Sequence, residues 1–143
     1  MFQVIQTPPI INAMVESAEP YVLIVDDEAL LREALVRWLK SMGYRSVAAE
    51  TADGAIDEIT RRLPFAVIAD MVMPIHDGLW LLEQIRARWP SLHVIMASGA
   101  DLDEQAVLKA RRLGASDFIA KPFGRETLYQ ALARAAKASE SSS

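Results

Sequence analysis

Residues 21–28 read YVLIVDDE, an apolar run that ends abruptly in three acidic side chains. A continuous apolar run of this length is typical of a parallel strand that is covered on both faces. Similar runs recur along the chain as FAVIA, HVIMA and DFIA, while a fifth run, RSVAA, is more polar and suits the edge of a sheet. The expected strands are Tyr21–Val25, Arg45–Ala49, Phe65–Ala69, His93–Ala97 and Asp117–Ala120.

The segments between these runs have helical spacing. In the first of them, apolar residues from Leu31 to Met42 repeat at i, i+3, i+4 and i+7, and Gly43 is placed to end the helix. Five βα repeats predict the α/β class and a three-layer (βα)5 sandwich with a five-stranded parallel sheet and right-handed crossovers. The expected helices are Ala29–Met42, Ala52–Arg62, Gly78–Trp89, Asp103–Leu113 and Arg125–Ala138.

Length and composition favour a single folded domain. The chain has 143 residues, of which 52% are hydrophobic, and we expect residues 21–138 to form the domain. Residues 1–20 are interpreted as a flexible extension, and residues 139–143 as a solvated tail or the start of a linker.

Charge and cysteine content exclude several function classes. A net charge of −4 without a basic stripe argues against direct nucleic-acid binding. The absence of cysteine excludes disulfides and thiolate metal sites. No apolar stretch approaches the roughly 20 residues of a membrane-spanning helix. We therefore expect a cytoplasmic protein that makes no membrane contact.

Polar side chains gather where the predicted strands end. Asp26 and Asp27 follow the first strand, Asp70 ends the third, Ser98 follows the fourth and Lys121 follows the fifth. The carboxyl ends of parallel strands share one edge of the sheet, and open α/β folds bind ligands there. These five side chains are therefore expected to converge.

Converging carboxylates repel one another unless a cation lies between them. Oxygen ligands with room for water suit Mg²⁺, whereas the absence of cysteine and the positions of His76 and His93 give little support to zinc or copper. A lysine and a hydroxyl beside the carboxylates suit the transfer of a phosphoryl group onto a carboxylate.

Four stretches carry a resemblance to a known family: VLIVDDE at 22–28, DMVMPIHDG at 70–78, VIMASGA at 94–100 and GASDFIAKPF at 114–123. In order and spacing they resemble the receiver domain of response regulators in two-component signal transduction, of the kind found in chemotaxis regulators. The resemblance covers roughly residues 21–137. It implies a flavodoxin-like strand order, 2-1-3-4-5.

The resemblance also implies a role for each site residue. Asp70 would be the phospho-acceptor, and Mg²⁺ would be held by Asp26, Asp27, Asp70 and the backbone carbonyl of Val72. Ser98 and Lys121 would contact the phosphoryl oxygens, and the Lys121–Pro122 bond would be cis. Ser98 and Phe118 would act as the switch residues.

The implied function is phosphorylation-controlled binding. A sensor histidine kinase or a histidine phosphotransfer protein would donate the phosphoryl group, and the domain would catalyse the transfer onto itself and its slow loss. The fourth helix, fifth strand and fifth helix would then change their partner binding, and the same surface is a candidate homodimer interface. The downstream effector or output domain is not identified by the sequence.

Several residues also allow plainer interpretations. Asp26 and Asp27 could begin a solvated turn that caps a helix, and Ser98 could be an ordinary turn residue. Phe118 could serve only as core. Trp80 lies on the polar side of its helix, where it could pack against a neighbouring loop or contact a partner.

Competing functions fit the sequence less well. A flavodoxin-like cofactor carrier needs a glycine- and hydroxyl-rich phosphate loop, and VDDE would repel a phosphate there. An aspartyl-enzyme phosphohydrolase would need an acid two residues after the nucleophile, where Val72 stands. A phosphorylation-independent scaffold would not need every residue type of an acceptor site.

Two apolar positions predict a long-lived phosphoryl group. Polar side chains two residues after the acceptor and two after the hydroxyl residue can orient the hydrolytic water. Val72 and Ala100 occupy these positions, and neither side chain can form a hydrogen bond. Hydrolysis is therefore expected to be slow.

Overall fold

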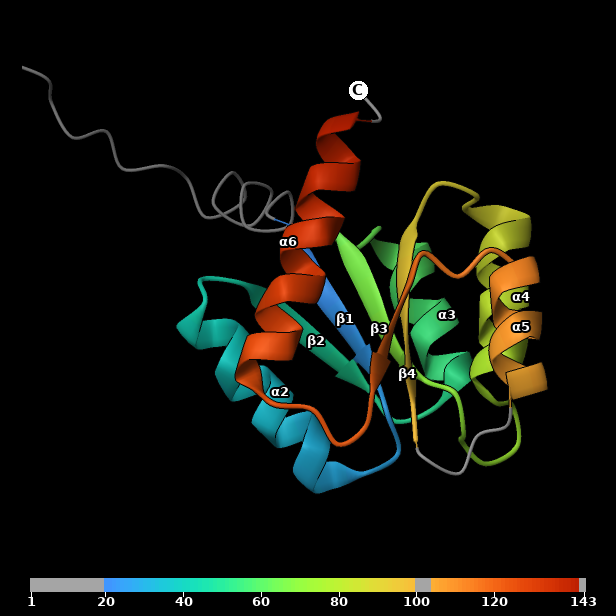
Figure 1. Cartoon of the computed structure of the whole chain (residues 1–143), viewed down its shortest axis with the longest axis horizontal. Helices are drawn as coiled ribbons and strands as arrows, with labels where there is room; N and C mark the ends of the chain where they lie inside the picture. Colours follow the sequence, from blue (N-terminus) through green and yellow to red (C-terminus); the bar gives the residue numbers. More distant parts are fainter. Residues whose placement is uncertain (1–19, 100–103, 142–143) are drawn as a thin grey trace, which may run out of the picture.

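The computed structural model describes residues 20–99 and 104–141. The expected extension, apart from Pro20, and the prediction for Ala100 lie outside the described residues. Strands and helices alternate along the described chain (Figure 1). The elements are β1 (Tyr21–Val25), α2 (Ala29–Ser41), β2 (Arg45–Ala49), α3 (Ala52–Arg61), β3 (Ala66–Asp70), α4 (Gly78–Arg88), β4 (His93–Ser98), α5 (Glu104–Arg112), β5 (Asp117–Ala120) and α6 (Arg125–Ser141).

The strands of the described chain form one parallel sheet in the order β2-β1-β3-β4-β5, which confirms the predicted topology. β1 lies between β2 and β3, so that Val25 is opposite Ala49 on one side and Ala69 on the other. Chain order reverses at this point, because β2 is added on one side of β1 and β3 on the other. Open α/β sheets bind ligands beside such a reversal.

Helices cover both faces of the sheet and make three layers (Figure 1). On one face, alternate strand residues such as Leu23 and Val67 pack against α3, α4 and α5. On the other face, Ile24 and Ile68 pack against α2 and α6. The central strands are buried on both faces, which is why their sequences are continuously apolar.

Several predicted boundaries were wrong by one residue. β3 begins at Ala66 and includes Asp70, and β4 includes Ser98, because strand pairing depends on backbone hydrogen bonds that a polar side chain does not interrupt. α2, α3, α4 and α5 each end one residue earlier than expected. Such shifts are common at frayed helix ends.

The last helix differs more from its prediction. α6 continues to Ser141, although residues 139–143 were expected to form a tail or linker. Neither glycine nor proline occurs after Gly124, so no strong helix breaker ends α6 at Ala138. None of the described helices is long and apolar enough to cross a membrane.

The parallel arrangement gives the sheet two distinct edges. We call the edge at which the strands begin, marked by Tyr21, Ala66 and His93, the amino edge. The edge at which they end, marked by Val25, Asp70 and Ser98, is the carboxyl edge. α6 follows β5 and runs back toward the amino edge (Figure 1).

Candidate functional site

The core of the candidate site is a pair of buried aspartates on adjacent strands. Asp70 is the last residue of β3, and Asp26 directly follows β1. Val25 of β1 is opposite Ala69 of β3. Asp26 and Asp70, which follow these two residues, therefore lie side by side at the carboxyl edge. Only 3% of Asp26 and 7% of Asp70 are exposed to solvent. Buried carboxylates are rare unless they are paired with a cation or with hydrogen-bond donors.

Lys121 is the cation that pairs them. Its backbone N–H donates to the Ser98 carbonyl (2.7 Å), which fixes the start of the loop after β5. From there its Nζ donates to Asp26 Oδ2 at 3.0 Å and to Asp70 Oδ2 at 2.9 Å. The Lys121–Pro122 bond is cis, as the resemblance implied.

The environment of Lys121 keeps its ammonium group charged. Burial is the largest single influence and acts to lower the pKa of Lys121. The hydrogen bonds to Asp70 and Asp26, together with the charges of these carboxylates, act in the opposite direction, and the net pKa of Lys121 is raised above its usual value. The site therefore carries a permanent positive charge beside two carboxylates.

The donor set at this edge suits a hard cation. Carboxylate oxygens of Asp26, Asp27 and Asp70 lie within 4.8 Å of one another, and Asp27 is exposed, which leaves one side open to water. Backbone N–H groups of Glu28 and Val72 donate to Asp26 Oδ1 (2.8 Å) and Asp70 Oδ1 (3.1 Å). Few protein oxygens with open solvent access are what Mg²⁺ sites offer.

Three further predicted site residues, Ser98, Val72 and Phe118, belong to β4, to the loop after β3 and to β5, respectively. Ser98 ends β4, one residue beyond Ala97, the residue that lies opposite Asp70. The Val72 side chain is 63% exposed. Phe118 is partly buried against the core on the α5 side, and the Arg111 guanidinium lies 5.3 Å from its ring centroid. The structure thus brings Asp26, Asp27, Asp70 and Lys121 together, while Phe118 packs as core.

The fold and this cluster agree with the comparison to known families. The model of the response regulator receiver domain matches residues 22–133. The chain belongs to this family. Receiver domains are signalling modules, and residues 22–133 contain both the sheet and the candidate site.

Individual relatives support the assignment to the receiver family. The chain is 39% identical over 116 residues to the chemotaxis protein CheY of Listeria monocytogenes, and the match covers 80% of this chain and 97% of CheY. It is 39% identical over 113 residues to the response regulator protein FleR of Pseudomonas aeruginosa, covering 79% of this chain but only 24% of FleR. Among solved structures, the receiver domain of NtrX from Brucella abortus has a TM-score of 0.75 at 36% identity, covering 80% of this chain and 96% of that domain.

Gly78 is a site residue of the receiver domain whose role the sequence analysis missed. A Cβ added at this position would overlap the Asp70 carbonyl oxygen and lie 2.7 Å from Met71 Cα. The Gly78 N–H donates to the Met71 carbonyl (3.1 Å), so the loop after Asp70 closes onto the strand end. Gly78 follows Asp77, which caps α4 by accepting from the Trp80 N–H (2.9 Å). An Asp-Gly pair at the start of a helix was the available signal.

Arg32 was also missed. Its Nη1 donates to the Asp26 carbonyl (2.7 Å) from one turn inside α2, and its Nη2 lies 3.4 Å from Glu50 Oε1. This contact holds the backbone of the acidic loop that follows β1. No sequence pattern predicts this contact, because an arginine near the start of a helix is most often exposed.

The Trp80 side chain contacts the loop between β3 and α4. The Trp80 ring is partly buried and stacks on His76, with ring centroids 3.9 Å apart. His76 Nε2 lies 3.9 Å from Asp53 Oδ2 on α3. Ile75, just before it, has φ = 70° and is 92% exposed, an uncommon conformation for a β-branched residue. Trp80 thus packs against a neighbouring loop, the first of the two interpretations.

Proposed function

We propose that this receiver domain accepts a phosphoryl group on Asp70 and requires Mg²⁺ to do so. The observation that carries the proposal is the position of Lys121, whose ammonium group bonds both Asp26 and Asp70. A purely structural ion pair needs one carboxylate. A lysine shared by two buried carboxylates, with a third carboxylate nearby, instead suits the binding of a phosphoryl group and a divalent cation.

In the proposed reaction an Asp70 carboxylate oxygen attacks the phosphorus of a phosphohistidine. The new P–O bond forms as the P–N bond breaks, and the imidazole nitrogen keeps the electron pair of the broken bond. Lys121 then pairs with a phosphoryl oxygen, and the Ser98 hydroxyl donates to another. The donor is a sensor histidine kinase or a histidine phosphotransfer protein, and the domain acts on itself rather than on a separate substrate.

Asp26, Asp27 and Asp70 would hold Mg²⁺ together with the backbone carbonyl of Val72. When bound, the cation neutralises negative charge on the phosphoryl oxygens. Asp27 is the exposed member of the cluster and has no contact with Lys121 among the described hydrogen bonds and ion pairs. It is therefore free to bind a cation without giving up an existing bond to the lysine.

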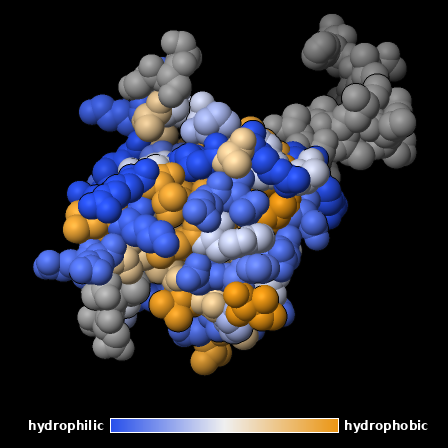
Figure 2. Space-filling model, turned by 90° about the vertical axis from the view of Figure 1, so that its right-hand side faces the viewer, coloured by the Kyte–Doolittle hydropathy of each residue, from blue (hydrophilic) through white to orange (hydrophobic). Residues whose placement is uncertain are grey.

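The output would pass through α5, β5 and α6. Movement of Ser98 toward the new anion would leave space for Phe118, which neighbours Met96 across β4 and β5. Figure 2 looks onto the side of the molecule formed by α4 and α5, where apolar side chains lie in separate patches among hydrophilic ones. The α5–β5–α6 surface would bind the effector or a second copy of the domain.

One of the relatives is a DNA-binding regulator that is much longer than this chain. The DNA-binding transcriptional regulator NtrC of Klebsiella pneumoniae is 40% identical over 101 residues, but the match covers only 21% of that protein. FleR is likewise matched over about a quarter of its length. The chain has a net charge of −4 and no basic stripe, so we propose a cytoplasmic phosphoryl-accepting module that does not itself bind nucleic acid.

Chemical labelling tests the acceptor. The protein is incubated with acetyl phosphate and Mg²⁺, reduced with borohydride, and mapped by peptide mass spectrometry. Borohydride reduces an aspartyl phosphate to homoserine with loss of phosphate, so one conversion to homoserine is expected, at Asp70, and none in Asp70→Asn. Asp57→Asn, which removes an exposed carboxylate on α3, is the matched control and should label like the unmodified protein. A label that persists in Asp70→Asn would place the acceptor elsewhere.

Metal titration tests the cation site separately. Millimolar Mg²⁺ should raise the melting temperature of the unmodified protein and of Asp57→Asn. Asp27→Asn should lose most of this increase, because it removes a ligand without touching Lys121. Equal increases in all three proteins would rule out Asp27 as a ligand.

A further inference from the structure

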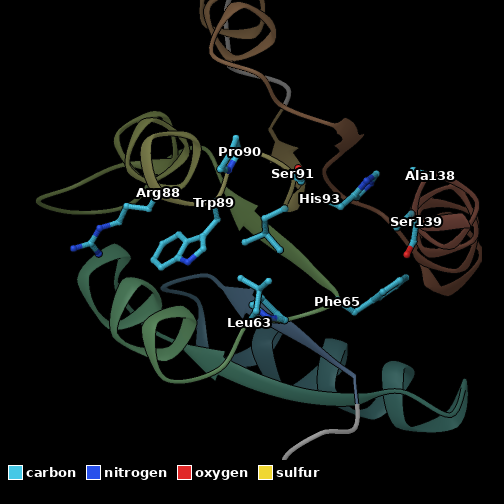
Figure 3. A pocket seen from close by; sticks show the side chains of 12 residues that line it. Leu63, Phe65, Arg88, Trp89, Pro90, Ser91, His93, Ala138 and Ser139 are labelled. Atoms are coloured by element: carbon cyan, nitrogen blue, oxygen red, sulfur yellow. The ribbon is translucent and has the colours of Figure 1, made fainter. Parts of the chain in front are cut away.

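A groove lies at the amino edge of the sheet, at the opposite end of the strands from Asp70 (Figure 3). It has a volume of about 490 Å³ and is formed by three segments: residues 63–65 before β3, residues 88–93 between α4 and β4, and the last turns of α6. Figure 3 shows Leu63 and Trp89 at one end, while Phe65 and His93 point toward Ala138 and Ser139 of α6 at the other.

The groove exposes apolar surface beside a buried histidine nitrogen. Leu63, one of the residues that line the groove, is 55% exposed. His93 Nε2 is buried and has no hydrogen-bond partner among the described residues. Covering the exposed Leu63 side chain would remove apolar surface from water.

The chain enters the sheet beside this groove. The Phe65 N–H donates to the Tyr21 carbonyl (2.7 Å), so a groove residue is bonded directly to the first residue of β1. Pro20, which precedes it, is exposed. Residues 1–19 therefore lead into the sheet at the amino edge and not at the carboxyl edge.

The sequence of this leading segment complements the groove. Between Pro9 and Pro20 the apolar residues are Ile10, Ile11, Ala13, Met14, Val15 and Ala18. Their spacing is that of one face of an amphipathic helix. Glu16 and Glu19 are the charged residues of the segment, and the groove offers the exposed Arg88.

We propose that residues 10–18 of the same chain dock in the amino-edge groove. Glu19 and Pro20 link this segment to Tyr21, and the Phe65 N–H already bonds the Tyr21 carbonyl, so the short link places the segment beside the groove. A tethered segment has an effective concentration in the millimolar range, so it outcompetes the same segment of a second copy at ordinary protein concentrations. Docking would cover Leu63 without contact with the acceptor site.

Engineered cysteines test this arrangement directly, because the chain has none of its own. Leu63→Cys is combined with Val15→Cys or, to allow for another helical register, with Ile11→Cys. Under mild oxidation at least one pair should form a disulfide within a single chain. Val36→Cys with Val15→Cys is the matched control, since Val36 is an exposed apolar residue on α2 outside the groove. It should give little disulfide.

A second experiment removes the segment and restores it. In ¹H–¹⁵N spectra, deletion of residues 1–19 should shift the Trp89 indole and the backbone amides of residues 63–65 and 92–93. A synthetic peptide of residues 5–20 should reverse these shifts. Acetyl phosphate labelling of Asp70 should continue in the deleted protein, which separates this test from that of the proposed function.

Three outcomes would overturn the proposal. They are disulfides that form only between two chains, equal disulfide yields for the groove and control pairs, and groove signals that do not change on deletion of residues 1–19.

Discussion

The two edges of the sheet are built from the same strands but hold opposite chemistry. The carboxyl edge gathers Asp26, Asp27, Asp70 and Lys121, whereas the amino edge has an apolar groove and a buried His93 Nε2 that has no hydrogen-bond partner within the described part of the chain. Each loop at the carboxyl edge leads into a helix N-terminus, whose N–H groups and positive dipole end favour anions. The amino edge receives helix C-termini, which offer no such support. Strand direction alone therefore decides which edge can hold a cluster of carboxylates.

The largest expected effect concerns Gly78. Gly78→Ala places a methyl group against the Asp70 carbonyl and Met71 Cα, which are backbone atoms that cannot move aside cheaply. We expect a loss of about 3 kcal/mol or more in the free energy of unfolding, measured by urea denaturation. Gly124→Ala is the control, because a Cβ there meets nothing within 4 Å, and it should change stability little. Equal losses would mean that the loop is not held against the strand end.

Lys121→Met should have the next largest effect. It leaves Asp26 and Asp70 buried without their cation, and we expect a loss of about 2 kcal/mol at neutral pH. The pKa of Lys121 is raised in the folded state, so its contribution is complete below its unfolded pKa near 10.5 and is lost as the pH rises through the folded value. Denaturation curves above pH 10 should therefore fall more steeply for the unmodified protein than for Lys121→Met.

The amino edge should respond to acid instead. Burial, the largest influence, lowers the pKa of His93 below its usual value of 6.5. Below that pH the unfolded chain binds a proton that the folded chain does not, so stability falls as the pH drops from 7 toward 5.5. His93→Gln should flatten this decline. If stability depends on pH in the same way in His93→Gln, burial of this imidazole is not the cause of the decline.

The smallest expected effect is on the lifetime of the phosphoryl group. Val72→Asn with Ala100→Glu supplies two side chains that can orient the hydrolytic water, so dephosphorylation should accelerate several-fold. A single-turnover decay assay with the labelled protein measures this rate. Decay at the same rate or more slowly would show that these positions do not limit hydrolysis.

The carboxyl edge was more predictable from the sequence than the amino edge. The strand ends fix where Asp26, Asp70 and Lys121 lie, because parallel strands in a known order bring their carboxyl ends to one edge. The hydrogen bonds from Lys121 to both carboxylates then follow from side-chain reach.

Other contacts depend on packing that no local pattern encodes. Arg32 reaches the Asp26 carbonyl only because of how α2 packs beside β1. The close approach at Gly78 depends on how the chain from Asp70 to Gly78 folds back onto the strand end. The groove requires three segments, residues 63–65, 88–93 and the end of α6, to meet. The extension of α6 to Ser141 was missed because its last turns lack the apolar periodicity that marks a buried helix.

The return of α6 to the amino edge has a practical consequence for protein engineering. Pro20 and the last described turn of α6 both lie at the edge where the strands begin, about 17 Å, or one five-residue strand, away from Asp70. A fluorescent reporter or purification tag fused directly before Pro20 or after the last described turn of α6 would therefore begin at the end of the sheet opposite the acceptor site. Immobilisation through such a tag should present the carboxyl edge to a kinase in solution, which suits this chain to surface-based measurement of phosphotransfer.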